Sequence, residues 1–297
     1  MELKEYITEE IEPCKKCPMS DSGCRKAYDR WIPEEPVPIV ICSEGPGYTE
    51  DRCGTPFVGA AEIMSSVCGM CIYLKKCFSW FLGLSRSYKG KEFKCRWPEA
   101  TIETLPESAT PDLIENRYLY LESMISNSNG RHAPRTAGQL LNELLKSVGL
   151  YRKSMIDFMR EPDTEVKPTV YTTNVVLCRP FILEDGKKNN REPFPLEIGN
   201  CSYHIKAIIE AVKPKVIIAP GRIAINTLTK LDEPVQQALK MATDGTLPSP
   251  IFKDIPIIPT YHPSYLSKLL GKNSNRFNSE KSRFITSLEL AKRIADS

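Results

Sequence analysis

The chain has 297 residues, of which 41% are hydrophobic, enough for a substantial core and for one large domain or two ordinary ones. No apolar run reaches the roughly 18 residues that suggest a membrane span, and the acidic start MELKEYITEE lacks the apolar stretch of a secretory signal. A formal net charge of only +3 means that a nucleic-acid partner has to be bound by local basic patches. We therefore expect an intracellular, cytoplasmic protein without a membrane partner.

Four short runs rich in valine and isoleucine predict buried parallel strands, at residues 37–42, 169–177, 215–219 and 255–260. Helical repeats of apolar residues lie between and after these runs. They cover residues 136–150, 198–213 and 279–295, with Thr136 and Ser279 as N-caps and Gly149 as C-cap. The alternation of strands and helices predicts an α/β fold, a parallel sheet layered by helices.

Ligands of such sheets bind where the carboxyl ends of the strands open into loops. Those loops are residues 43–59, 178–197, 220–222 and 261–268. The first of them reads SEGPGYTEDRCGTPFVG, which is too polar for a core and too particular for a spacer. We expect the functional site to lie at this edge of the sheet.

Residues 61–135 differ from the rest, because they combine four cysteines with several aromatic residues and the polar tail SNSNGRHAPR. We interpret them as an insertion within a single domain that spans residues 1–297. One helix is expected in the insertion, near residues 111–125.

Eleven cysteines in a reducing compartment indicate metal ligation rather than disulfides. Cys14 and Cys17 form a CxxC ahead of the first strand, Cys178 ends the second strand, and Cys201 lies on the next helix. Four soft ligands near one edge of the sheet could hold zinc or a [4Fe–4S] cluster. The alternative is that Cys178 and Cys201 are small buried apolar side chains.

A second group of cysteines lies in the insertion, with the spacing C-x2-C-x5-C-x17-C. It consists of Cys68, Cys71, Cys77 and Cys95. A short, weakly apolar insertion would gain stability from a metal, so we expect either a second site for zinc or iron or, alternatively, scattered free thiols.

Several motifs occur together and in one order along the chain. They are SEGPGYTEDRCGTPFVG, TAGQLLNELLKSVGL, TTNVVLCRP followed by NREP and Cys201, PGRIA, and TYHPSYL. As an ordered set they resemble the motifs of the family 4 uracil-DNA glycosylases, the iron–sulfur branch of that superfamily. The resemblance covers all but the insertion and the extreme ends.

The resemblance implies a three-layer αβα sandwich around a short, mainly parallel four-stranded sheet. It also implies hydrolysis of the N-glycosidic bond of uracil in DNA after the base is flipped out, which leaves an abasic site. At the positions that match the family's cysteines, Cys14, Cys17, Cys178 and Cys201 would hold a structural [4Fe–4S] cluster. We expect a monomer that acts on uracil-containing DNA, and the sequence names no clamp or repair partner.

The chemistry of uracil excision suggests a role for several residues at this edge of the sheet. The ring of Phe57 would stack on the base, and Asn174 would read its N3–H and O4 groups. His262 would donate to the O2 atom as charge develops there. Glu44 and Glu50 occupy the family's carboxylate positions and would assist the oxocarbenium-like sugar, while Gly45 would let the backbone come close.

Each of these residues also has an ordinary structural interpretation. Phe57 could be a plain core residue, Glu50 part of a solvated acidic turn, and a single histidine is more often structural than catalytic. DNA would be gripped by Arg179, Arg191 and Lys268, with Leu266 as a wedge in the gap left by the flipped base. The alternatives for function are a non-catalytic DNA-binding protein with this fold and a glycosylase for another deaminated base, hypoxanthine or xanthine.

Overall fold

The computed structural model describes most of the chain outside the insertion. The described residues are 2–57, 87–88, 91–92, 137–153 and 167–297, apart from short gaps at 22–23, 25, 30, 48–49, 52–53, 185–186 and 271. Within these ranges, no helix is both long enough and apolar enough to cross a membrane.

The central sheet has four parallel strands in the order β4–β1–β7–β8. Their bounds are Ile39–Ser43 for β1, Val170–Asn174 for β4, Val216–Pro220 for β7 and Ile257–Thr260 for β8. All residues of these strands are buried, so β1, β7 and β8 are mainly continuous apolar runs, whereas β4 (VYTTN) also buries two threonines and an asparagine. The four predicted strands are confirmed, although the second ends at Asn174 and residues 175–177 already belong to the following loop.

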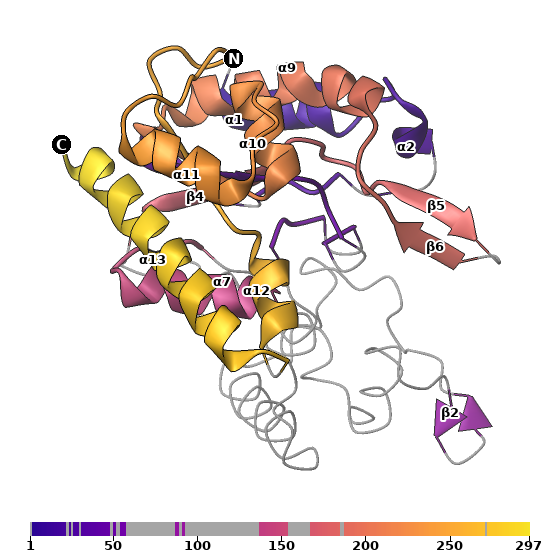
Figure 1. Ribbon diagram of the computed structural model, residues 1–297. Helices are drawn as coiled ribbons and strands as arrows, with labels where there is room; N and C mark the ends of the chain where they lie inside the picture. Colours follow the sequence, from indigo (N-terminus) through magenta and orange to yellow (C-terminus); the bar gives the residue numbers. More distant parts are fainter. Residues whose placement is uncertain are drawn as a thin grey trace, which may run out of the picture.

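Two helical layers cover the two faces of this sheet (Figure 1). One layer contains α1 (Leu3–Tyr6), the π-helical turn η1 (Ile7–Ile11), α9 (Pro195–Val212), α10 (Arg222–Thr229) and α11 (Val235–Thr243). The other contains α7 (Ala137–Ser147), α12 (Pro263–Leu269) and α13 (Ser274–Asp296).

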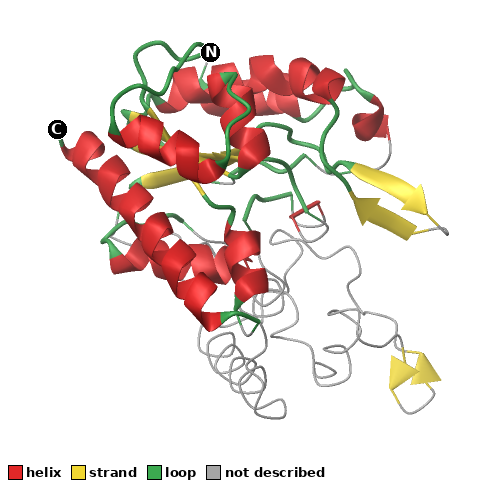
Figure 2. Cartoon of the chain, viewed as in Figure 1, coloured by secondary structure: helices red, strands yellow, loops and turns green. Residues whose placement is uncertain are grey.

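Successive strand residues point to opposite layers, since side chains alternate along a strand. Val40 and Ile217 pack with the layer of α9, whereas Ile41 and Ile218 pack with that of α7 and α13. The three-layer αβα sandwich and its parallel four-stranded sheet are therefore confirmed, and Figure 2 shows the strands between the two sets of helices.

Helix ends depart from the predictions where a different cap is used. Helix α13 begins five residues before the predicted Ser279, because the side chain of Asn273 accepts a hydrogen bond from the backbone N–H of Arg276 at 3.0 Å. Gly149 follows α7 with φ +71°, as expected of a glycine that ends a helix. Thr136 lies outside the described residues.

In the described part of the chain, two antiparallel hairpins lie outside the main sheet. One pairs β5 (Phe181–Glu184) with β6 (Lys187–Asn190) directly after the end of β4, and Figure 1 shows it projecting from the sandwich. The other pairs β2 (Ser87–Tyr88) with β3 (Lys91–Glu92). A short helix, α2, spans Pro18–Asp21 near the N-terminus.

The second hairpin is the only part of residues 61–135 that the structure describes. The helix expected at 111–125 lies outside the described residues, as do the cysteines at 68, 71, 77 and 95. The interpretation of 61–135 as an insertion in a single domain therefore stays a prediction, and so does a second metal site there.

Candidate active site

The carboxyl ends of the four strands lie along one edge of the sheet. Ser43 ends β1 beside Asn174 of β4, and Pro220 ends β7 beside Thr260 of β8. Because the strands are parallel, the loops that carry the predicted site residues begin along a single rim.

Two aromatic rings from the first and the last of these loops lie together at the rim. The ring centroids of Phe57 and His262 are 6.3 Å apart, and the planes are 23° from parallel. Phe57 is buried, with 4% of its surface exposed, and belongs to the apolar cluster around α7 and α13. Its backbone φ is +55°, a region that a phenylalanine rarely adopts, so the surrounding loop must hold it there.

The hydrogen bonds of His262 define its tautomer. His262 is the N-cap of α12, and its Nδ1 accepts from the backbone N–H of Ser264 at 3.1 Å, while the Ser264 hydroxyl lies 2.7 Å from the same nitrogen. Burial, with a smaller effect of the nearby Lys268, lowers the pKa of His262 from 6.5 to about 4. The ring is thus neutral at pH 7 and carries its proton on Nε2, which can act as a donor.

Unpaired polar atoms end three of the four strands. Ser43 Oγ, Asn174 Nδ2 and Thr260 Oγ1 are buried and have no hydrogen-bond partner among the described residues. Buried polar groups are normally paired with protein, water or ligand. The three groups at this rim can therefore donate to or accept from a polar ligand or water, and Thr260 is a residue that the sequence did not single out.

The two glutamates of the first loop have different environments. Glu50 accepts from the backbone N–H of Gly47 at 2.6 Å and of Phe57 at 2.5 Å, so it holds the loop closed and is not part of a solvated turn. Glu44 lies at the rim near Glu192 and Arg222. Burial, helped by Glu192 and opposed by Arg222, raises the pKa of Glu44.

The cysteines ahead of β1, after β4 and on α9 line one cavity. Cys17, Cys178 and Cys201 are buried and Cys14 is partly exposed, with Lys16 and Lys26 in the same lining. The nitrogens of His204, which also lines the cavity, contact the hydroxyls of Tyr6 at 3.0 Å and Tyr203 at 2.5 Å. The ligands available in this cavity are therefore the four thiols.

Four buried or partly buried thiols in one cavity form a soft set of ligands, which suits zinc or an iron–sulfur cluster. Burial raises the pKa of Cys178 to about 12 and of Cys201 to about 11, so metal binding would have to release their protons.

Comparison with known proteins decides the family. The family model of the uracil DNA glycosylase superfamily matches residues 31–285 of the chain. The chain belongs to this superfamily. A type-4 uracil-DNA glycosylase of Archaeoglobus fulgidus is 24% identical over 270 residues, which cover 89% of this chain and 83% of the relative. Its counterpart in Thermotoga maritima is 31% identical over 168 residues, covering 56% of this chain and 69% of the relative.

Within this superfamily member, two residues expected to contact DNA are buried. Arg179 is 3% exposed, donates from Nε to Asn190 Oδ1 at 2.7 Å and lies 4.0 Å from the Asp51 carboxylate. Leu266 is fully buried in the apolar cluster that also contains Phe57. Both side chains turn inward, and the DNA contact predicted for Arg179 and the wedge predicted for Leu266 stay predictions.

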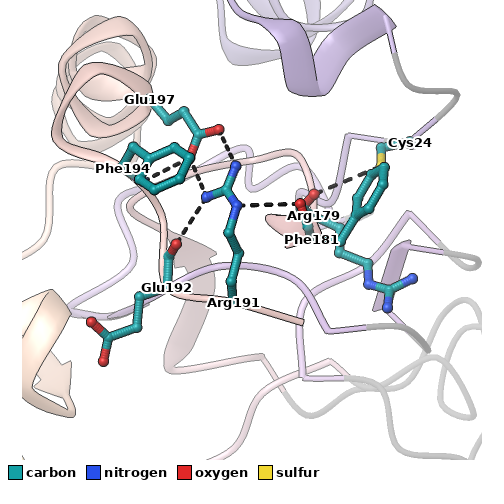
Figure 3. Close-up of polar contacts among 7 residues, drawn as sticks. All are labelled: Cys24, Arg179, Phe181, Arg191, Glu192, Phe194 and Glu197. Atoms are coloured by element: carbon teal, nitrogen blue, oxygen red, sulfur yellow. Dashed lines mark hydrogen bonds and ion pairs between the residues drawn. The ribbon is translucent and has the colours of Figure 1, made fainter. Parts of the chain in front are cut away.

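Arg191 is engaged within the protein (Figure 3). Its guanidinium donates to both carboxylate oxygens of Glu197 and to the carbonyl oxygens of Phe181 and Glu192, and it stacks 3.8 Å from the ring centroid of Phe194. These contacts fasten the end of the β5–β6 hairpin to the start of α9. Among the residues predicted to grip DNA, Lys268 is exposed, and it lies near His262.

Two glycines of the rim have close neighbours. A Cβ atom on Gly45 would lie 2.7 Å from Val176 Cγ2, so this glycine is needed for packing of the loop against the chain after β4. Gly221, with φ +88°, would place a Cβ 3.4 Å from that of His262. The fragment PGRIA marked this turn in the sequence, but only the structure shows that it supports the histidine.

Proposed function

We propose that this protein hydrolyses the N-glycosidic bond of uracil in DNA and leaves an abasic site. The observation that carries the proposal is the pairing of a buried Phe57 ring with a neutral His262, at a rim where the Asn174 amide has an unpaired donor. The matched relatives are named type-4 uracil-DNA glycosylases, which supports the same reaction here.

The flipped base would be held by an aromatic face and a side-chain amide. Phe57 supplies the flat apolar surface against which a pyrimidine can stack. Asn174 Nδ2, which has no partner among the described residues, can donate to O4 of uracil while its Oδ1 accepts from N3–H. Cytosine has an amino group at position 4 and no proton at N3, so both contacts would be lost with the wrong base.

The leaving uracil would be stabilised by His262. The anion carries its charge on O2, and a neutral imidazole with the proton on Nε2 is a donor suited to that atom. The hydrogen bond from Ser264 N–H to Nδ1 fixes this tautomer before the substrate arrives, so the donor is already oriented.

Glu44 is the carboxylate that we assign to the developing positive charge of the sugar. Its partly buried position beside Arg222 leaves it near the rim, whereas both oxygens of Glu50 are occupied by loop N–H groups. A carboxylate close to the anomeric carbon stabilises an oxocarbenium-like transition state. Glu50 would act indirectly, by holding the loop that carries Phe57, and Gly45 would keep that loop against Val176.

Cys14, Cys17, Cys178 and Cys201 would hold a [4Fe–4S] cluster. Bound there, the cluster would serve as a structural cross-link and supply no redox step to the reaction. The four ligands come from the segment after η1, the loop after β4 and helix α9, so they would tie the N-terminal segment to the loop that follows Asn174. Lys16 and Lys26 line the same cavity and favour the negative charge of the thiolates.

DNA would reach the rim as a substrate of a monomer. The exposed Lys268 lies close to His262 and can neutralise a phosphate next to the flipped nucleotide. To act on this substrate, the protein would have to be in the same compartment as the genomic DNA.

The test is excision from an oligonucleotide with a single uracil, followed by alkali to break abasic sites. We expect the iron-loaded protein to give cleavage at the uracil. A control oligonucleotide of the same sequence, with thymine in place of the uracil, should not be cleaved. Parallel substrates with hypoxanthine or xanthine test the wider lesion range. Binding without any abasic product at high protein concentration would instead identify a non-catalytic DNA-binding protein.

A further inference from the structure

We propose that Arg152 is a positioning residue for excision, and that it acts by clamping Phe57 in the conformation that stacks on the base. The inference rests on the proposed function, because it assumes that the ring of Phe57 receives uracil. Arg152 lies after α7, outside the four strand-end loops that drew attention in the sequence.

The Phe57 backbone needs an external restraint. Its φ of +55° lies in the left-handed region, which is unfavourable for a residue with a Cβ atom. Residues held in such conformations persist only when their surroundings fix them from several sides. A free loop would relax, and the ring would leave its place beside His262.

Two oppositely charged side chains supply this restraint from the two sides of one residue. The Glu50 carboxylate accepts from the N–H of Phe57 at 2.5 Å, and the Arg152 guanidinium donates to its carbonyl oxygen at 3.0 Å. Arg152 also donates to the carbonyl oxygen of Pro56 at 3.5 Å. Together these contacts fix the N–H and the C=O of the strained residue.

The guanidinium is itself held in place. Its Nε donates to Asn142 Oδ1 on α7 at 2.6 Å, and the side chain is buried, with 4% of the residue exposed. A buried positive charge needs a negative charge nearby. Burial raises the pKa of Glu50 and of Asp29, and the charge of Arg152 opposes this by lowering both, so the two carboxylates and the guanidinium favour each other's charged forms. The clamp is thus anchored to a rigid helix and surrounded by carboxylates that balance its charge.

Lysine cannot reproduce this arrangement, because it lacks the planar fork that reaches two carbonyl oxygens and the Asn142 amide at once. The structure therefore predicts a graded loss of uracil binding. The loss should be greatest in Arg152→Gln, smaller in Arg152→Lys, and smallest in Asn142→Ala, where the guanidinium remains but is no longer aimed.

The experiment measures the affinity for free uracil in two ways, by inhibition of excision and by direct calorimetric titration. We expect Arg152→Gln to weaken uracil binding about tenfold or more, the scale of losing one base–aromatic stack, with partial recovery in millimolar guanidinium. The matched control is Arg293→Gln on the exposed end of α13, which should bind uracil like the wild type.

Each outcome separates the clamp from the function on which it rests. A folded Arg152→Gln protein with wild-type uracil affinity would refute the clamp, even if its melting temperature falls, because a purely structural role lowers stability alone. If Arg152→Gln does not fold, Asn142→Ala decides by the same criterion. Wild-type protein that neither excises nor binds uracil would instead overturn the proposed function, and the clamp with it.

Discussion

Replacing His262 by asparagine should make the protein more resistant to acid while it abolishes most excision. Asparagine is a good N-cap, so its side chain can still accept from Ser264 N–H, but it does not titrate. The pKa of His262 is about 4 in the folded state and 6.5 as a free side chain, because burial disfavours the charged ring. At 1.36 kcal/mol per pKa unit, this difference corresponds to about 3 kcal/mol.

The sign of the effect follows from proton binding. Between pH 6.5 and about pH 4 the unfolded chain binds a proton at His262 and the folded protein does not. Wild-type stability is therefore complete above pH 6.5 and decreases as the pH falls through this window, with no further loss from this group below about pH 4.

Urea unfolding of both proteins, from pH 7.5 to 4, measures the difference directly. The free energy of unfolding of the wild type should fall by about 3 kcal/mol more than that of His262→Asn. Acid damage at other sites cancels in the comparison. Parallel curves for the two proteins across this range would show that the imidazole is not buried in its neutral form, and would remove the physical basis for its role as a neutral donor.

Three further predictions concern packing and the cysteine cavity. Gly45→Ala should lower stability by about 1–3 kcal/mol, and Val176→Ala should restore part of it, because the new Cβ would meet Val176 Cγ2 at 2.7 Å; a double-mutant cycle by thermal unfolding measures the coupling. Tyr203→Phe should leave excision by freshly iron-loaded protein intact but speed the loss of the cluster's visible absorption in air. The reason is that the Tyr203 hydroxyl lies 3.6 Å from Cys14 Sγ, and its hydrogen bond to that sulfur would be lost. Removal of iron should lower the melting temperature and expose the N-terminal segment to protease, as fragment mapping would reveal; an unchanged digestion pattern would argue against a structural cluster.

The sheet could be predicted because a strand that is buried on both faces has a continuous run of apolar residues, which is visible in the sequence. Strands such as VIIAP, and IVICS up to its final serine, are continuously apolar, and a strand covered by two layers has that composition. Helix ends were less predictable, since caps such as Asn273 compete with other polar residues nearby. Helices α10, α11 and α12 were not predicted, since helices of seven to nine residues give too few turns for a clear apolar repeat.

Exposure could not be predicted for single side chains. Arg179 follows a strand in a loop with other cations, but its guanidinium turns inward to Asn190 and Asp51. Leu266 follows the histidine motif, but α12 points it into the core. Chain position determines which rim a residue occupies, whereas its direction depends on the packing of elements distant in sequence.

The most informative residues were those that depart from their usual local structure, and only some of these departures can be recognised in the sequence. Asn174 stands out in the sequence, because an amide at the end of a buried strand is unfavourable unless something pairs with it. The positive φ of Phe57 is invisible there, since no residue type reports a strained backbone. A site that depends on a strained backbone requires other residues to hold that backbone in place. Arg152 does not stand out in the sequence, but it donates to the carbonyl oxygen of Phe57, so its loss should directly disturb the position of the ring.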